Sequence, residues 1–121
     1  MSGASPRPGD GRVALVTGVG AGVGGIGRGI GERLAGEGYA LVLADLDPQV
    51  REIAERLAQA AEGRRVTAHV GDLSEEAVVE ALVADAIEAH GRVDVLVNNA
   101  GGGVIRPFLE HDAASLRATL A

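Results

Sequence analysis

Residues 13–31 read VALVTGVGAGVGGIGRGIG and combine three kinds of local sequence. The first four residues form an uninterrupted apolar run, which is typical of a strand buried on both faces of a parallel sheet. Six of the ten residues in 18–27 are glycine, and Ile26, Ile30 and Leu34 then recur at helical spacing. This part of the chain therefore predicts a strand, a glycine-rich loop and a helix, in that order.

A glycine-rich junction of this kind suits a dinucleotide. Without Cβ atoms the loop can turn tightly, and its backbone amides can approach a pyrophosphate at the positive end of the following helix. The next apolar run, 39–44, ends at Asp45, which lies twenty residues after Gly25. An acidic residue about 20 residues beyond the loop can accept hydrogen bonds from the hydroxyls of an adenosine ribose. The alternative is a glycine turn that binds nothing, and the order of strand, loop, helix, strand and acid favours binding.

The remainder of the chain alternates helical and extended patterns. Apolar residues recur at helical spacing within 50–61 and within 78–87, and the apolar runs 65–70 and 93–97 predict strands. Short loops between alternating strands and helices indicate right-handed crossovers. We therefore expect an α/β fold, a Rossmann-type doubly wound parallel sheet with four strands in the order 3-2-1-4, incomplete as it stands. The expected helix ends are Asp47-Pro48 and Gly63 for the second helix, and Ser74 and His90-Gly91 for the third.

Length and composition narrow the class of protein. The 121 residues allow one domain. Within it, residues 1–11 hold two prolines and three glycines without an apolar run, so we expect a frayed tail there. Cysteine is absent, which excludes disulfides and thiolate chemistry and fits a reducing compartment. No segment approaches the roughly 20 uninterrupted apolar residues that cross a bilayer. We expect a cytoplasmic protein without a membrane partner.

Charge argues against a polyanionic partner. The chain has 17 acidic and 11 basic residues and a net charge of −6. All the basic residues are arginine, and no basic cluster stands out along the sequence. Nucleic acid is therefore not an expected partner. His69, His90 and His111 lack the spacing of metal ligands, so we expect a strand-end residue, a helix-end cation and a loop or cap residue, and no metal site.

Four short motifs together resemble a known family. They are Thr17-Gly18 with Gly25-Ile26-Gly27, the acidic Asp45, the pair Asp72-Leu73, and the stretch Asn98-Asn99-Ala100-Gly101. In this order they resemble the short-chain dehydrogenases/reductases, from about Arg12 to the last residue. The last of the four motifs is the most distinctive. The resemblance implies hydride transfer between a nicotinamide dinucleotide and a small alcohol or carbonyl substrate.

The resemblance also implies which residues bind the cofactor. The family's motifs surround the pyrophosphate, hold the adenosine ribose, flank the adenine and line the path toward the nicotinamide. Carried over to this sequence in that order, these sites are Gly18, Gly24, Gly25, Ile26 and Gly27; Asp45 with Leu46; Asp72 and Leu73; and Asn99, Ala100 and Gly101. Asp94 and Asn98 are expected to be structural and to bond strand and loop backbone.

The glycine loop departs from the family's usual length. Six residues, 19–24, separate Thr17-Gly18 from Gly25-Ile26-Gly27, where the family usually has a shorter loop. Two alignments are open. If Gly22-Val23-Gly24 is the working motif, the loop has the usual length and the extra residues fall at the helix start. If Gly25-Ile26-Gly27 is, the loop is longer, but the following helix and the distance to Asp45 fit the family better, so we prefer this alignment.

Charge favours NAD over NADP. A carboxylate at Asp45 would repel a 2′-phosphate, and no arginine lies between Thr17 and Ile26 to receive one. Arg28, Arg64 and Arg65 are the nearest alternatives, and we expect them to be solvated, as such side chains usually are.

The family's proton-transfer residues have no counterpart here. The family uses a serine, a Tyr-x-x-x-Lys motif and an asparagine beyond the fourth motif, but the only tyrosine here is Tyr39 in a strand, and lysine is absent. Ser115 falls in an expected final helix, 112–121. No catalytic residue is therefore assigned, and we expect residues 12–121 to be an NAD-binding domain that stops before the catalytic half.

Two classes of function remain open. The first is the cofactor-binding part of an NAD-dependent short-chain dehydrogenase, whose complete form we expect to be a homo-oligomer. The second is a non-catalytic nucleotide-binding module or a truncated remnant. The sequence beyond Ala121 would separate them, because it either continues into the serine and Tyr-x-x-x-Lys motifs or does not.

Overall fold

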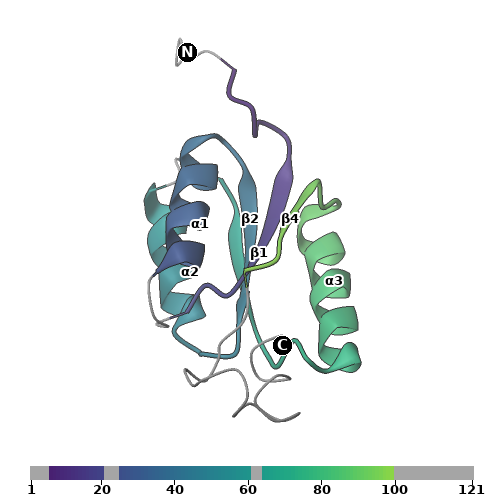
Figure 1. Ribbon diagram of the computed structural model, residues 1–121. Helices are drawn as coiled ribbons and strands as arrows, with labels where there is room; N and C mark the ends of the chain where they lie inside the picture. Colours follow the sequence, from purple (N-terminus) through teal and green to yellow (C-terminus); the bar gives the residue numbers. More distant parts are fainter. Residues whose placement is uncertain (1–5, 21–24, 61–63, 100–121) are drawn as a thin grey trace, which may run out of the picture.

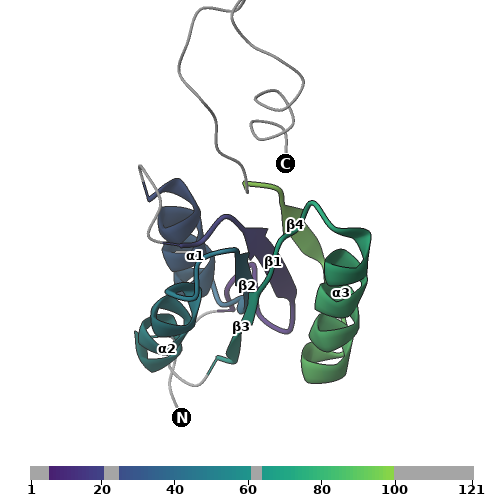
Figure 2. The same ribbon diagram turned by 90° about the horizontal axis from the view of Figure 1, so that it is seen from below.

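The computed structural model describes residues 6–20, 25–60 and 64–99, which form a three-layer α/β fold. A four-stranded parallel sheet has the order β3-β2-β1-β4, so the expected class and strand order are confirmed. Two helices cover one face of the sheet and one helix covers the other (Figures 1 and 2). The elements are β1 (Val13–Thr17), α1 (Ile26–Gly36), β2 (Ala40–Asp45), α2 (Val50–Ala60), β3 (Val66–Val70), α3 (Glu76–His90) and β4 (Val95–Val97).

The two faces of the sheet build separate apolar clusters. Successive side chains of a strand point to opposite faces, so β1 and β2, which are adjacent at the centre of the sheet, serve both clusters. The cluster beneath α1 and α2 contains Val16 and Leu43 with Leu57 of α2, and the cluster beneath α3 contains Leu15 and Val42. All five residues of β1 are buried, as a central parallel strand requires.

Helix α1 contacts the sheet through small residues. Gly27, Gly31 and Ala35 are its buried positions. Of the three apolar residues at helical spacing, Ile30 and Leu34 are half-buried against the cluster beneath α1 and α2, whereas Ile26 is 65% exposed. The helical spacing predicted the helix correctly, but the face of α1 nearest the strands is formed by Gly27, Gly31 and Ala35, which lets the helix backbone lie close to the sheet.

The sequence predicted the carboxyl end of α3 correctly but not its amino end. Gly91 adopts the left-handed conformation with φ of 81°, and its N–H donates to the carbonyl of Ile87 at 2.8 Å, so the expected C-cap is confirmed. Ser74 is not the N-cap. The N-cap is Glu75, whose side chain makes no capping hydrogen bond. The Ser74 hydroxyl donates to Asp72 at 2.6 Å and so does not cap the helix.

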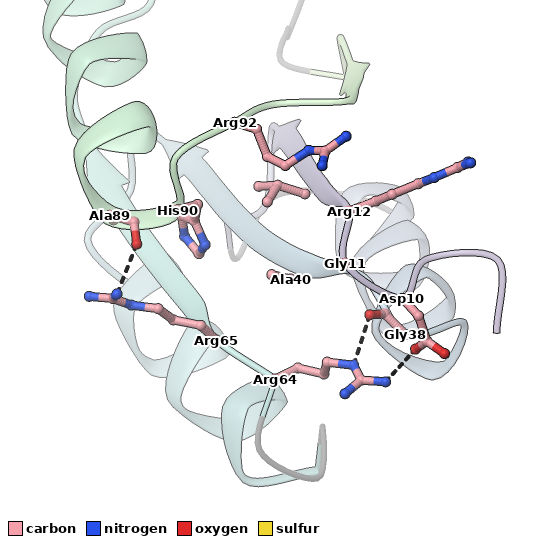
Figure 3. Close-up of a pocket in the computed structure, with 11 residues that line it drawn as sticks. Asp10, Gly11, Arg12, Gly38, Ala40, Arg64, Arg65, Ala89, His90 and Arg92 are labelled. Atoms are coloured by element: carbon pink, nitrogen blue, oxygen red, sulfur yellow. Dashed lines mark hydrogen bonds and ion pairs between the residues drawn. The ribbon is translucent and has the colours of Figure 1, made fainter. Parts of the chain in front are cut away.

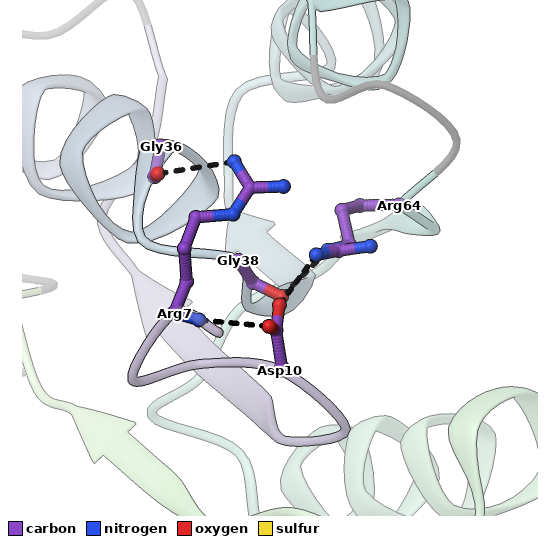
Figure 4. Close-up of polar contacts among 5 residues, drawn as sticks. All are labelled: Arg7, Asp10, Gly36, Gly38 and Arg64. Atoms are coloured by element: carbon purple, nitrogen blue, oxygen red, sulfur yellow. Dashed lines mark hydrogen bonds and ion pairs between the residues drawn. The ribbon is translucent and has the colours of Figure 1, made fainter. Parts of the chain in front are cut away.

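Residues 7–12 form a hydrogen-bonded turn, which differs from the frayed tail expected over 1–11 (Figure 4). The N–H of Gly9 donates to the carbonyl of Glu37 at 2.8 Å, and a Cβ at Gly9 would lie 2.3 Å from the Tyr39 ring. The carboxylate of Asp10 pairs with Arg64, more than fifty residues along the chain. Long-range contacts of this kind leave no local sequence signal, which explains the difference. Residues 1–5 lie outside the described part.

An apolar surface extends along α3 and β4. Val79, Val83 and Ile87 are 38%, 47% and 47% exposed, and Leu96 is 58% exposed. The helical spacing within 78–87 predicted the helix, but of its apolar residues only Leu82 and Ala86 are buried. Strand β4 is also shorter than the expected 93–97. None of the helices in the described part of the chain is long and apolar enough to cross a membrane.

Candidate functional site

The carboxyl ends of β1, β2 and β4 meet at one edge of the sheet, where parallel α/β folds bind ligands. The chain leaves β1 at Gly18, which has a φ of 75°. The N–H groups of Gly18 and Val19 both donate to the carbonyl of Ala44, at 2.9 and 3.4 Å, and the Val19 side chain is fully buried. The start of the glycine loop is therefore fixed against the end of β2.

Gly27 brings the first turn of α1 against this loop. A Cβ at Gly27 would lie 2.4 Å from the carbonyl oxygen of Gly18 and 2.7 Å from the side-chain nitrogen of Asn99. No side chain larger than hydrogen fits there without movement of the backbone. Gly25, which precedes the helix, has a φ of 60° in the left-handed region. Of the two alignments, this geometry supports Gly25-Ile26-Gly27 as the motif that contacts the loop.

The positive end of the α1 helix dipole, at the amino terminus of the helix, is not neutralised by a side chain of its first turn or N-cap. Its first turn has no acidic residue and its N-cap makes no side-chain hydrogen bond. The first N–H groups of a helix have no intrahelical partner and favour an anion. Ile26 in the same turn is 65% exposed, so the helix start is open to a ligand.

A network of hydrogen bonds joins the ends of β1 and β4. The backbone N–H of Asn99 donates to the Thr17 hydroxyl oxygen at 3.0 Å, and that hydroxyl donates to the carbonyl of Val97 at 3.4 Å. The Asn99 side-chain N–H donates to the carbonyl of Gly18 at 3.2 Å. Thr17 is 5% exposed and is the one buried polar residue in the described part of the chain. Sequence reasoning did not assign it a role, although a threonine that ends an apolar strand could have suggested one.

Asp45 stands at the end of β2 with one carboxylate oxygen engaged. Its Oδ1 accepts the N–H of Asp47 at 2.7 Å. A Cβ at Gly20 would lie 2.5 Å from the same oxygen, so Gly20 leaves the space that this carboxylate occupies. The role of Gly20 was not predicted individually. Leu46 is 69% exposed beside Asp45.

Asp72 and Leu73 follow β3 and differ in their surroundings. Asp72 is exposed, and its Oδ1 accepts both the backbone N–H and the hydroxyl of Ser74, at 2.9 and 2.6 Å. The hydroxyl bond and then the N–H bond hold the pKa of Asp72 below its usual value. Leu73 is half-buried against the cluster beneath α3. In the loop after β3, Asp72 therefore lies on the surface, whereas Leu73 is half-buried and packs toward α3.

Three of the sequence-predicted site residues, Gly24, Ala100 and Gly101, lie outside the described residues, as do His111, Ser115 and Gly63. Asp94 has the structural role that was expected, because its Oδ2 accepts the N–H of Val13 at 2.8 Å and so joins the starts of β4 and β1. The same expectation is wrong for Asn98, whose side chain is exposed and makes no hydrogen bond within the described residues. Within the described ranges, no group of three or more histidine and acidic residues could hold a metal ion.

Two expectations about charged residues are wrong. Arg64 is not a simple solvated side chain, because it donates to the carbonyl of Gly38 at 2.8 Å and pairs with Asp10. Arg65 is exposed, as expected, and it also donates to the carbonyl of Ala89 at 2.8 Å. His90 is not a favourable helix-end cation, since burial and then the charge of Arg65 lower its pKa. All three lie at the amino ends of the strands, opposite the glycine loop.

Comparison with known proteins identifies the family. The model of the short chain dehydrogenase family matches residues 12–121, nearly the whole chain. This chain belongs to that family. A 2,3-dihydroxy-2,3-dihydro-p-cumate dehydrogenase from Pseudomonas putida is 47% identical over 114 residues, which are 93% of this chain and 42% of that enzyme. The chain therefore spans less than half the length of this relative.

Solved structures agree in fold. A short chain dehydrogenase from Mycobacterium smegmatis is 34% identical and superimposes with a TM-score of 0.81 over 92% of this chain and 45% of that one. A metagenomic short-chain oxidoreductase, solved in complex with NADP, is also 34% identical, with a TM-score of 0.78 over 93% of this chain and 49% of that one. The four-stranded parallel sheet and three helices in the described part of this chain thus have the Rossmann fold of short-chain dehydrogenases.

Proposed function

We propose that this chain binds NAD and forms the cofactor-binding part of a dehydrogenase that transfers hydride between the nicotinamide and a small alcohol or carbonyl substrate. The observation that carries the proposal is the space at Gly27. Helix α1 starts against Gly18 and Asn99 so closely that a Cβ would collide with both. A helix start held at this distance from a glycine loop is the arrangement that admits a pyrophosphate.

The residues at this edge fit the two halves of the adenosine end of the cofactor. Gly18, Gly25 and the open amides at the start of α1 suit the pyrophosphate, and Asp45 suits the ribose because one of its oxygens has no partner within the described residues. Leu46 and Asp72 flank Asp45 on exposed loops where the adenine would lie. The proposed site comprises Gly18, Gly24, Gly25, Ile26, Gly27, Asp45, Leu46, Asp72, Leu73, Asn99, Ala100 and Gly101.

The preference for NAD over NADP rests on Asp45. A carboxylate beside the ribose repels a 2′-phosphate. The Asp47 N–H orients this carboxylate, and Gly20 leaves room for it. Arg64 and Arg65, the cations that could have served a phosphate, lie at the opposite end of the sheet. A related short-chain oxidoreductase was solved in complex with NADP, so the proposed preference for NAD rests on Asp45 of this chain and not on the fold.

The chain's own contribution to the reaction is binding and orientation. A bound nicotinamide supplies the hydride acceptor or donor. Asn99, through its bonds to Thr17 and Gly18, fixes the end of β4 beside the cofactor's path. We assign the proton relay to the remainder of a complete protein, which we propose to be a cytoplasmic homo-oligomer, because the exposed apolar face of α3 and β4 suits an interface.

A non-catalytic nucleotide-binding module is the second candidate, because the site proposed here, with Gly18, Gly27, Asp45 and Asn99, serves to bind a dinucleotide and includes no proton-transfer residue. Both candidates bind NAD and differ in turnover. Oxidation of an alcohol with NAD by the purified 1–121 chain would contradict the assignment of the relay to residues outside it.

The test of binding compares two glycine substitutions in one helix. Gly27→Val fills the space against Gly18 and Asn99, whereas Gly29→Ala enters open space. We expect calorimetric titration to show NAD binding that Gly27→Val abolishes and Gly29→Ala preserves, with circular dichroism confirming that both variants fold. Equal NAD affinity in the two folded variants would contradict the proposed site.

A further inference from the structure

Gly20 stands in the glycine loop at a position where the backbone does not require a glycine. The glycines with a positive φ in the described part of the chain are Gly11, Gly18, Gly25, Gly38 and Gly91. Gly20 is not among them, so a residue with a Cβ can adopt its backbone conformation. The neighbours of Gly20, and not its own dihedral angles, therefore limit which side chain fits there.

The neighbour that excludes a side chain at Gly20 is the carboxylate of Asp45. A Cβ at Gly20 would lie 2.5 Å from Oδ1 and 2.8 Å from Cγ of Asp45, and 3.1 Å from Cβ of Asp47. The first two distances are far inside van der Waals contact. The carboxylate therefore occupies the space in which the first side-chain carbon of any other residue would lie.

Of these two groups, the loop is held in place and the carboxylate can move. The N–H groups of Gly18 and Val19 donate to the carbonyl of Ala44, and the Val19 side chain is fully buried. The backbone before Gly20 is thus fixed against β2. Asp45 is half-buried, and its side chain has other staggered rotamers. An alanine at position 20 is therefore expected to displace the carboxylate and to leave the fold intact.

The position of the Asp45 carboxylate depends on two successive Asx turns. Its Oδ1 accepts the N–H of Asp47 at 2.7 Å, and Oδ1 of Asp47 accepts the N–H of Gln49 at 2.9 Å. The N–H of Val50, the first residue of α2, donates to the carbonyl of Asp47 at 3.1 Å. The turn that leads into α2 thus fixes one oxygen of the carboxylate, and it does so only while the space beside Gly20 is open.

The other oxygen of this carboxylate has no partner in the part of the chain that the structure describes. Oδ2 of Asp45 accepts no hydrogen bond there, and Asp45 forms no ion pair there. Arg64 and Arg65 lie at the amino ends of the strands, where Arg64 turns toward Asp10 and Arg65 toward the carbonyl of Ala89 (Figure 3). The negative charge at the end of β2 is therefore left for a ligand.

We propose that Gly20 is a positioning residue that sets the preference of this chain for NAD over NADP, an inference that rests on the proposed dinucleotide site. Because Gly20 has no side chain, the Asp45 carboxylate lies against the glycine loop with Oδ1 on the Asp47 N–H and Oδ2 open to the ribose hydroxyls. In that position it accepts hydrogen bonds from the ribose of NAD and repels the 2′-phosphate of NADP. A side chain at position 20 weakens both effects by displacing the carboxylate.

The affinity test uses the full 1–121 chain and titrates NAD and NADP calorimetrically into the parent, Gly20→Ala and Gly29→Ala. The control Gly29→Ala adds the same methyl group where a Cβ meets nothing within 4 Å. We expect Gly20→Ala to weaken NAD binding about tenfold, as loss of a charge-assisted hydrogen bond does, and not to weaken NADP binding. Gly29→Ala should leave both affinities unchanged.

A second background shows whether Gly20 acts through the carboxylate. Asp45→Ala removes the atoms that a Cβ at position 20 would meet most closely, so adding Gly20→Ala to it should not weaken NAD binding further. An equally large loss in both backgrounds would mean that the methyl group acts on the loop itself, and would overturn the proposal. A Gly20→Ala variant that binds NAD as the parent does, or that is unfolded by circular dichroism, would overturn it too.

The amide of Asp47 tests the position of the carboxylate without any cofactor. In proton–nitrogen correlation spectra, the signal of this amide proton should move upfield in Gly20→Ala, because the proton loses its acceptor, and should stay in place in Gly29→Ala. A signal that Gly20→Ala leaves unchanged would overturn this inference whether or not NAD binds. A parent that binds no NAD would contradict the proposed function, and this inference with it, even if the amide signal moves.

Discussion

The side-chain amide of Asn99 donates a hydrogen bond to the carbonyl oxygen of Gly18 at 3.2 Å, so the end of β4 is joined directly to the start of the glycine loop. The two residues are more than eighty positions apart in the sequence. A Cβ at Gly27 would lie within 2.7 Å of the same amide nitrogen. The end of β4, the glycine loop and the start of α1 therefore meet around the Asn99 side chain. A substitution in any one of these segments is expected to alter the geometry of the other two.

Loss of the Asn99 amide should weaken NAD binding. Asn99→Ala leaves the Gly18 carbonyl without its side-chain donor, and a hydrogen bond contributes about 1 kcal/mol net, which corresponds to a roughly fivefold weaker affinity. The matched control is Asn98→Ala, since Asn98 is exposed and makes no hydrogen bond within the described residues. Calorimetric titration measures both variants, and an equal effect of the two would show that the Asn99 bond does not shape the site.

Helix α1 can be stabilised without loss of the fold. A Cβ at Gly29 meets nothing within 4 Å, so Gly29→Ala should raise the free energy of unfolding by about 0.5–1 kcal/mol through helix propensity. The measurement is urea denaturation. At Gly31 a Cβ would lie 3.4 Å from Leu57 Cδ1, so Gly31→Ala should give a gain of similar size or slightly smaller. Destabilisation by Gly29→Ala would mean that this face of α1 is covered.

Acid should weaken the contact that joins the starts of β4 and β1, in which the Val13 N–H donates to the Asp94 carboxylate. The bond from Arg92, and then the Val13 N–H, hold the pKa of Asp94 below its usual value, so the folded-state pKa is below the unfolded-state pKa. The stability from this group is present above the unfolded value of about 3.9 and is lost as pH falls through the folded value. Asp94→Asn should therefore lower stability near pH 7, and the difference from the parent should shrink at pH 3 and below.

The matched control for this pH effect is Glu55→Gln on α2, because Glu55 is exposed and makes no ion pair within the described part of the chain. Urea denaturation from pH 2 to 7 follows both variants. A stability difference for Asp94→Asn that does not change with pH would show that the carboxylate's charge is not what joins the two strands.

The sequence predicted the order of the elements well, because their signals are local. Apolar runs, helical spacing and the glycine cap at Gly91 each lie within a few residues. The burial of α1 through Gly27 and Gly31 was not predicted, since hydrophobic periodicity gives no weight to glycine. The turn 7–12 and the bonds of Arg64 depend on partners far along the chain, and no local pattern encodes them.

The residues of the candidate site were likewise predicted where the signal is local and not where it depends on distant contacts. Residues in recognisable motifs, such as Gly18, Asp45 and Asn99, lie together at the carboxyl edge of the sheet. Thr17 and Gly20 support them through packing and hydrogen bonds that only the fold reveals. The motif residues were therefore predicted from the sequence, whereas the residues that support them were not.

The exposed face of α3 and β4 should cause self-association of the isolated 1–121 chain. Val79, Val83 and Ile87 follow one side of the helix, and Leu96 is exposed on β4. Apolar patches and uncovered strand edges promote association, so we expect concentration-dependent oligomers in sedimentation velocity. Val83→Glu should reduce them, whereas Ala81→Glu, an exposed position toward the opposite side of α3, should not. A monomer at all concentrations would show that this face needs no cover.

The most direct test of the account is the ratio of NAD to NADP affinity in the parent and in Asp45→Ser/Leu46→Arg. Because Asp45 is proposed to hold the ribose, the parent should bind NAD at least tenfold more tightly than NADP, and the double variant should lose NAD affinity and gain NADP affinity. The substitution at Leu46 supplies an arginine at a residue that is 69% exposed. A parent that prefers NADP, or a double variant with an unchanged ratio, would contradict the assignment of Asp45.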